Sequence, residues 1–84
     1  IKNFRKFLKG FIITRKLNLY LAEGEILQQI GQIYYKEEKY PKALDFYEKA
    51  LAIAKQVPEQ KLEVTVINSM GEVYIEQAYY SKAE

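Results

Sequence analysis

The 84-residue chain carries a net charge of +2, is 49% apolar and contains neither cysteine nor histidine. These absences exclude disulfides, a thiolate nucleophile, the commonest general base and the commonest zinc ligands, so we expect no enzymatic activity, no metal and no cofactor. The apolar content is typical of a globular chain, and no apolar run reaches the roughly 18 residues that span a bilayer. No signal peptide is visible, so we expect a cytoplasmic protein, and the start at Ile1 suggests a piece of a longer chain.

Charge is spread unevenly along the sequence. Residues 1–20 carry six basic and no acidic residues, whereas residues 21–84 carry seven lysines against eleven acidic residues. Such asymmetry is typical either of an interaction arm or of a solvated helix face. The acidic remainder and the absence of a groove-reading motif argue against a nucleic-acid partner.

Apolar residues recur at helical spacing in four stretches. In the first, residues 3–13, they occupy relative positions 0, 3, 4, 7 and 8, which form one stripe on a helix. Residues 25–35 follow the same period, and a third stretch, residues 41–56, begins at a proline that suits the first turn of a helix. The fourth, residues 59–77, contains several β-branched residues but keeps a period of about 3.6 residues, which favours helix over strand. The predicted fold class is therefore all-α.

Two segments of the chain match each other at a shift of 40 residues. Residues 28–43 align on residues 68–83, and the same shift places Phe11 on Leu51. The identical pairs are Gly31 with Gly71, Tyr34 with Tyr74, Tyr40 with Tyr80, Lys42 with Lys82, and Ala43 with Ala83. Internal repeats of this length indicate a stacked array of similar units.

The repeated pattern resembles the tetratricopeptide repeat (TPR), in which large apolar, glycine, tyrosine, alanine and aromatic residues follow at fixed spacing. The first copy has Leu27, Ile30, Gly31, Tyr34, Ala43 and Tyr47 at these positions. The second copy has Ile67, Met70, Gly71, Tyr74 and Ala83. The usual period is about 34 residues, and the longer one here is similar to that of bacterial signalling proteins, kinesin light chains and Leu-Gly-Asn scaffold proteins.

The resemblance implies an antiparallel helix-hairpin array, a solenoid fragment that forms a single TPR-like domain over residues 1–84. Residues 1–21 would be the second helix of a degenerate repeat and residues 22–58 a full repeat. Residues 59–84 would be the first helix of the next repeat plus a stub. Because uncapped ends of such arrays expose apolar surface, we expect self-association through the solenoid ends.

The resemblance also implies a function, namely a non-catalytic protein–protein interaction scaffold that binds a peptide or partner protein in its concave groove. In this family the first helix of each repeat lines the groove. The implied binding residues are Gln28, Gln29, Gln32, Tyr35, Lys36, Asn68, Ser69, Glu72 and Ile75, and Glu25, Thr65 and Glu76 share the same faces. Amides suit this task, because they offer donors and an acceptor to a peptide bond without a charge.

Three alternatives stay open beside this interpretation. The polar residues of the predicted groove can simply be a solvated face. The domain can be the peptide-sensing part of a bacterial signalling protein. The basic N-terminal helix can lie on an anionic membrane surface. A fourth function, capture of an acidic C-terminus as in chaperone-tail-binding relatives, is disfavoured, because the corresponding positions hold Gln28, Gln32 and Ser69, with Glu72 nearby.

Overall fold

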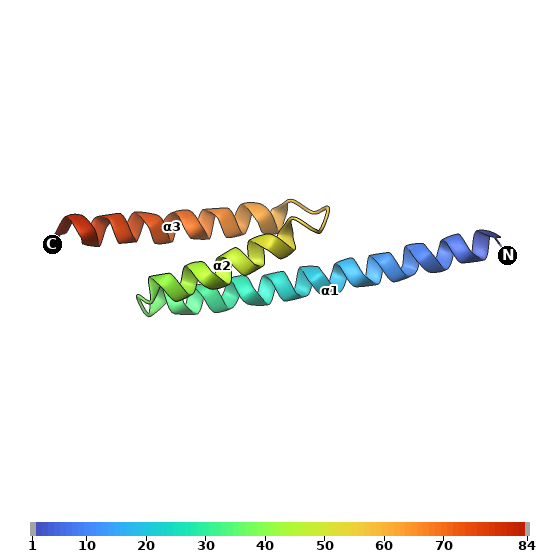
Figure 1. Cartoon of the computed structure of the whole chain (residues 1–84), viewed down its shortest axis with the longest axis horizontal. Helices are drawn as coiled ribbons and strands as arrows, with labels where there is room; N and C mark the ends of the chain where they lie inside the picture. Colours follow the sequence, from blue (N-terminus) through green and yellow to red (C-terminus); the bar gives the residue numbers. More distant parts are fainter. Residues whose placement is uncertain (1, 84) are drawn as a thin grey trace.

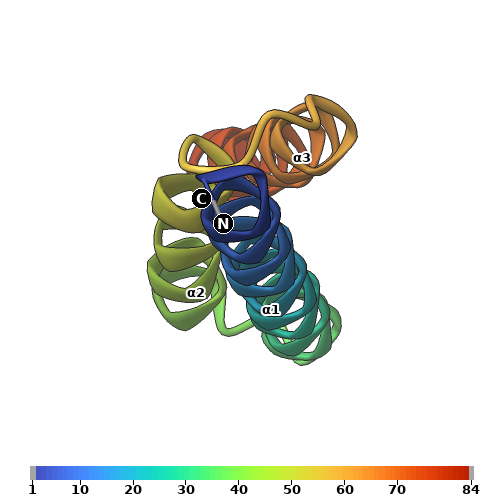
Figure 2. The ribbon, with the colours of Figure 1, turned by 90° about the vertical axis from the view of Figure 1, so that its right-hand side faces the viewer.

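The computed structural model describes residues 2–83 and consists of three helices joined by two short connections (Figure 1). The helices are α1 (Lys2–Lys36), α2 (Tyr40–Ala54) and α3 (Lys61–Ala83). Consecutive helices run antiparallel, and the end-on view shows α2 and α3 on two different sides of α1 (Figure 2). No strand occurs among the described residues, and the predicted all-α hairpin array is confirmed.

Helix α1 differs from the prediction, because it is one continuous helix of 35 residues. The sequence predicted separate helices over residues 3–13 and 25–35, and this prediction is wrong. The intervening residues 14–24 contain no proline and a single glycine, Gly24, so nothing local interrupts the backbone hydrogen bonds. Phe4 and Phe7 of the first predicted stripe lie outside the residues whose side chains are described.

The continuous α1 makes the molecule elongated. Its N-terminal half extends beyond the other two helices (Figure 1), and the principal extents are 68 × 17 × 13 Å. The radius of gyration is 17.1 Å, against about 12 Å for a compact chain of this length. The N-terminal half of α1 therefore lies largely outside the packed part of the structure.

A tight turn reverses the chain between α1 and α2. The Lys39 N–H donates to the Tyr34 carbonyl at 2.9 Å and the Glu38 N–H to the Tyr35 carbonyl at 3.0 Å, while Glu38 adopts a φ of 64°. This is the hydrogen-bond pattern of a Schellman C-cap, which requires one left-handed residue. Pro41 then lies in the first turn of α2, as predicted, where its missing N–H leaves no helical hydrogen bond unmade.

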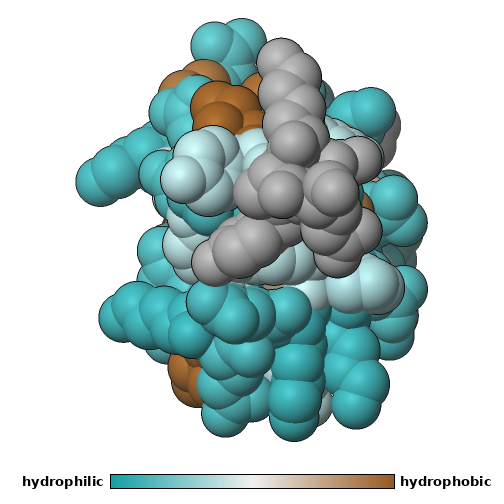
Figure 3. Space-filling model, turned by 90° about the vertical axis from the view of Figure 1, so that its left-hand side faces the viewer, coloured by the Kyte–Doolittle hydropathy of each residue, from teal (hydrophilic) through white to brown (hydrophobic). Residues whose placement is uncertain are grey.

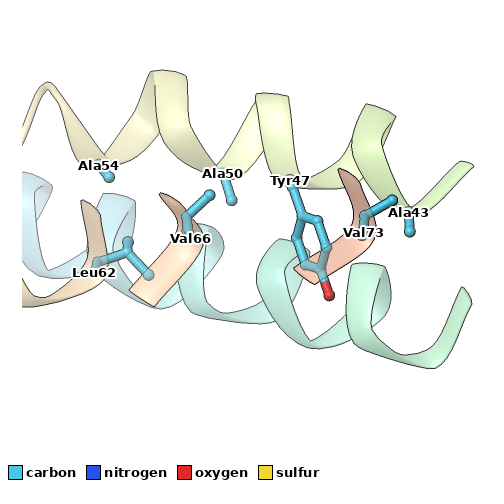
Figure 4. Close-up of a cluster of buried hydrophobic side chains, with 7 residues drawn as sticks. All are labelled: Ala43, Tyr47, Ala50, Ala54, Leu62, Val66 and Val73. Atoms are coloured by element: carbon cyan, nitrogen blue, oxygen red, sulfur yellow. The ribbon is translucent and has the colours of Figure 1, made fainter. Parts of the chain in front are cut away.

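The buried core lies on the face of α2 that α1 and α3 cover (Figure 4). Small α2 residues allow the helices to approach closely, and Tyr47 fills the space beside Gly31, where a Cβ atom would lie 2.5 Å from its ring. The cluster consists of Ala43, Tyr47, Ala50 and Ala54 from α2 with Leu62, Val66 and Val73 from α3. The repeat residues Gly31, Ala43 and Tyr47, together with Ala50, therefore pack α1 against α2.

The surface is not uniformly polar. Seen from the end that carries the α1–α2 turn, hydrophilic side chains predominate (Figure 3). Large apolar side chains are instead exposed along α1 and α3. Within the described part of the chain, neither α1 nor α3 has a stretch apolar enough to cross a bilayer.

Candidate partner-binding surface of α1 and α3

The predicted binding residues divide between α1 and α3. These two helices run in the same direction (Figure 1), because α2 reverses the chain between them. Gln28 of α1 and Ser69 of α3 join the helices directly. We call the exposed predicted residues on both sides of this contact the α1–α3 surface.

Gln28 and Ser69 form a buried hydrogen-bonded pair. The Gln28 Nε2 donates to the Ser69 Oγ at 3.2 Å, and the Ser69 hydroxyl donates to the Thr65 carbonyl at 3.0 Å. Each of the two residues is 7% exposed. The expectation that they lie on an open face is therefore corrected, because their polar groups already satisfy one another between the helices.

The remaining predicted residues stay accessible around this pair. Tyr35 is half-buried, and Ile75 is 69% exposed. The other exposed members of the surface are Gln29, Gln32, Lys36, Asn68 and Glu72. The structure thus leaves polar side chains available on both helices, and two of the nine predicted residues serve to hold the helices together.

Two carboxylates, those of Glu72 and Glu76, lie near Tyr35 at one end of the α1–α3 surface. Partial burial, followed by the carboxylates of Glu76 and Glu72, raises the pKa of the Tyr35 phenol above its ordinary value. A negative field disfavours the phenolate and so favours the neutral, hydrogen-bonding form of Tyr35. Neither carboxylate forms an ion pair with a described residue.

The internal repeat of the sequence already indicated that Gln28 and Ser69 lie near each other. The 40-residue shift places Gln28 opposite Asn68, one residue from Ser69, so the two side chains lie at the same height of successive first helices. What the repeat pattern did not contain is the approach of α1 to α3, which brings the amide within hydrogen-bonding distance of the hydroxyl.

Hollows in the protein surface lie elsewhere. One of about 290 Å³ is lined by residues of α1 and of the α2–α3 connection, including Leu17, Leu21 and Val57. Another borders Gly10 and Phe11, and neither contains a predicted binding residue. Among the described residues no group of three or more acidic side chains is placed to hold a metal ion. The α1–α3 surface thus belongs to neither of these two hollows.

Comparison with known proteins gives two matches. A family model described as tetratricopeptide repeat matches residues 20–84. The human intraflagellar transport protein 88 homolog is 26% identical over 80 residues, an alignment that covers 95% of this chain and 10% of that protein. The chain therefore spans about a tenth of the length of this curated relative. No solved structure matches the chain.

Proposed function

Because the chain belongs to the tetratricopeptide repeat family, we propose that it is a non-catalytic module that binds a peptide segment of a partner protein on the α1–α3 surface. Repeats of this family generally mediate interactions between proteins. The 40-residue shift between Gly31 and Gly71 supports the long-period type of repeat. The matched region begins at residue 20, close to the proposed repeat boundary at residue 22.

The observation that supports this site is the buried Gln28–Ser69 hydrogen bond. It joins the two helices side by side, with the exposed amides of Gln29, Gln32 and Asn68 beside the contact. A preorganised surface loses less conformational entropy on binding. Each amide can donate to and accept from a peptide backbone.

The charges on the α1–α3 surface indicate which peptides it can bind. Partial burial and then the carboxylates of Glu76 and Glu72 raise the pKa of Tyr35, and Lys36 is the one basic member of the predicted site. A free C-terminal carboxylate would meet like charge at that end of the surface. We therefore propose recognition of an internal, uncharged or basic segment, with Tyr35, Lys36, Glu72 and Ile75 contributing around the amides.

Selection from a phage-displayed library of random 12-residue peptides tests the proposal, with affinities of selected peptides measured by fluorescence anisotropy. Gln32→Ala and Asn68→Ala should each weaken binding about 3- to 10-fold, because each removes an uncharged hydrogen bond. Gln60→Ala is the matched control, since Gln60 is an exposed amide in the α2–α3 connection. Failure to enrich any peptide, or equal affinity for wild type and the double variant Gln32→Ala/Asn68→Ala, would refute the proposed site.

A further inference from the structure

Helix α1 carries an apolar stripe that no other described residue covers. Ile12, Leu19, Ile26 and Ile33 recur every seven residues and are 60%, 65%, 57% and 57% exposed, respectively. A seven-residue spacing keeps side chains close to one line on a helix, so the stripe runs for about 32 Å. Single exposed apolar residues are ordinary, but a continuous row of them marks an interaction surface.

The stripe faces away from α2 and α3. Gly24 and Gly31 mark the side of α1 that packs against Leu62 and Tyr47. Ile26 and Ile33 each follow one of these glycines by two residues, which rotates them about 200° around the helix. Figure 2 shows the same arrangement, with α2 and α3 on two sides of α1 and neither of them on the remaining side.

The internal repeat shows how such a face is normally covered. Val66 and Val73 occupy the positions of α3 that Ile26 and Ile33 occupy in α1, at the 40-residue shift. Both valines are fully buried in the core cluster with α2. This face of a first helix is therefore suited to a second helix lying antiparallel across it.

The same shift identifies the segment that matches this cover. Residues 3–14 correspond to residues 43–54 of α2, and within them Leu8 and Ile12 lie near the same line of α1 as Leu19 and Ile26. Since α1 is continuous, residue 10 lies about 24 Å along the axis from residue 26, and the segment cannot fold back onto its own helix. A copy of this segment can reach the stripe only from another molecule.

We propose that two copies of the chain associate through antiparallel α1 helices, each covering residues 22–33 of the other with its N-terminal part. This contact is two-fold symmetric and closes on itself. It leaves Gln32 free, because Gln32 lies about 100° around the helix from Ile33. Gln29, three residues after Ile26 and four before Ile33, lies beside the stripe. The dimer contact therefore borders the proposed peptide site at Gln29 and leaves Gln32 and the α3 residues of that site free.

Charge selects the antiparallel orientation. Residues 5–16 carry five basic and no acidic residues, whereas residues 22–33 carry Glu23 and Glu25 and no basic residue. Antiparallel packing places the basic segment of each copy beside the acidic segment of the other, and parallel packing would place the two basic segments together. An anionic membrane would attract only the basic half of the stripe and repel the other half.

Sedimentation equilibrium of the 84-residue chain over a range of concentrations tests the association. The wild type should dimerise, and Leu19→Gln, in the middle of the stripe, should weaken dimerisation at least about 10-fold. Because Leu19 is 65% exposed, the variant should keep its helical circular dichroism. Its melting temperature should equal that of the wild type at concentrations where the wild type is monomeric. Ile67→Gln, on the exposed side of α3, is the control and should leave the dimer unchanged.

Three outcomes of that experiment would overturn the proposal. They are a wild-type monomer at every concentration, a Leu19→Gln dimer as strong as the wild type, and a dimer that Ile67→Gln abolishes. The last result would assign the association to end-to-end stacking through α3. Co-sedimentation with phosphatidylserine–phosphatidylcholine vesicles adds a fourth, since binding of monomers to these vesicles would assign the stripe to a membrane.

Orientation is tested by a spin label at Lys36→Cys, which is specific because the chain has no cysteine. In the antiparallel dimer the two labels lie at opposite ends of the interface, on the order of 50 Å apart. Parallel helices in register would bring them within about 20 Å. A short label–label distance by pulsed electron paramagnetic resonance would therefore refute the antiparallel arrangement.

Discussion

Helices α1 and α3 share one residue pattern, yet opposite faces of the two are covered. A Cβ atom at Gly31 would lie 2.5 Å from the Tyr47 ring, whereas one at the equivalent Gly71 meets no atom within 4 Å. Conversely, Val73 is fully buried and the equivalent Ile33 is 57% exposed. The repeat pattern thus specifies two apolar faces on each first helix, and the position of that helix in the array decides which face is buried.

Helix α2 differs from both, because it lies between them. It contributes four of the seven residues of the core cluster, and its alanines allow close approach. Substitutions on the buried face of α2, and at the positions that face it, should therefore affect stability most. Equivalent substitutions on the uncovered faces should affect it least.

The largest effect is expected for Tyr47→Ala. Tyr47 is 1% exposed, so removal of its ring leaves a cavity between α1 and α2 and should lower the free energy of unfolding by about 3–5 kcal/mol. Tyr74→Ala, at a residue that is 51% exposed, should lower it by less than about 1 kcal/mol. Urea denaturation followed by circular dichroism measures both, and equal losses would contradict the difference between covered and uncovered faces.

The two repeat glycines should respond with opposite signs. Gly31→Ala places a methyl group against the Tyr47 ring and should destabilise the fold by about 1–3 kcal/mol. Gly71→Ala meets open space in the middle of α3 and should stabilise it by up to about 1 kcal/mol, since alanine is the better helix former. Thermal and urea unfolding of the Gly31→Ala and Gly71→Ala variants measure both changes in stability. A loss of stability in Gly71→Ala would show that this face of α3 is covered.

A smaller difference in stability is expected between alanine variants of the two neighbouring glutamines, Gln28 and Gln29. Gln28→Ala removes the buried hydrogen bond to Ser69 and should cost about 1–2 kcal/mol. Gln29→Ala, at an exposed residue, should change stability by less than about 0.5 kcal/mol. If chemical denaturation gave equal values for the two variants, Gln28 would lie on the open face that the sequence predicted.

Much of the fold could be predicted from the sequence, because it depends on local residue patterns and on the internal repeat of 40 residues. The 3.6-residue period of apolar residues predicts helices, and Pro41 predicts the start of α2. Glycine opposite tyrosine, with alanines on the facing helix, predicts close packing. For the candidate site, the same pattern predicted the residues that flank the contact of α1 with α3, and seven of the nine are accessible.

One further property has a local cause that the repeat pattern concealed, and tertiary structure alone decided two others. The continuity of α1 overrides the repeat pattern, because backbone hydrogen bonds propagate through residues 14–24 unless a proline or a capping turn stops them. Gln28 and Ser69, which are 41 residues apart in the chain, are buried because α1 and α3 meet at that point. Which of two equivalent apolar faces is buried depends on the helix that lies beside it, and burial is a property of neighbours in space rather than of residue order.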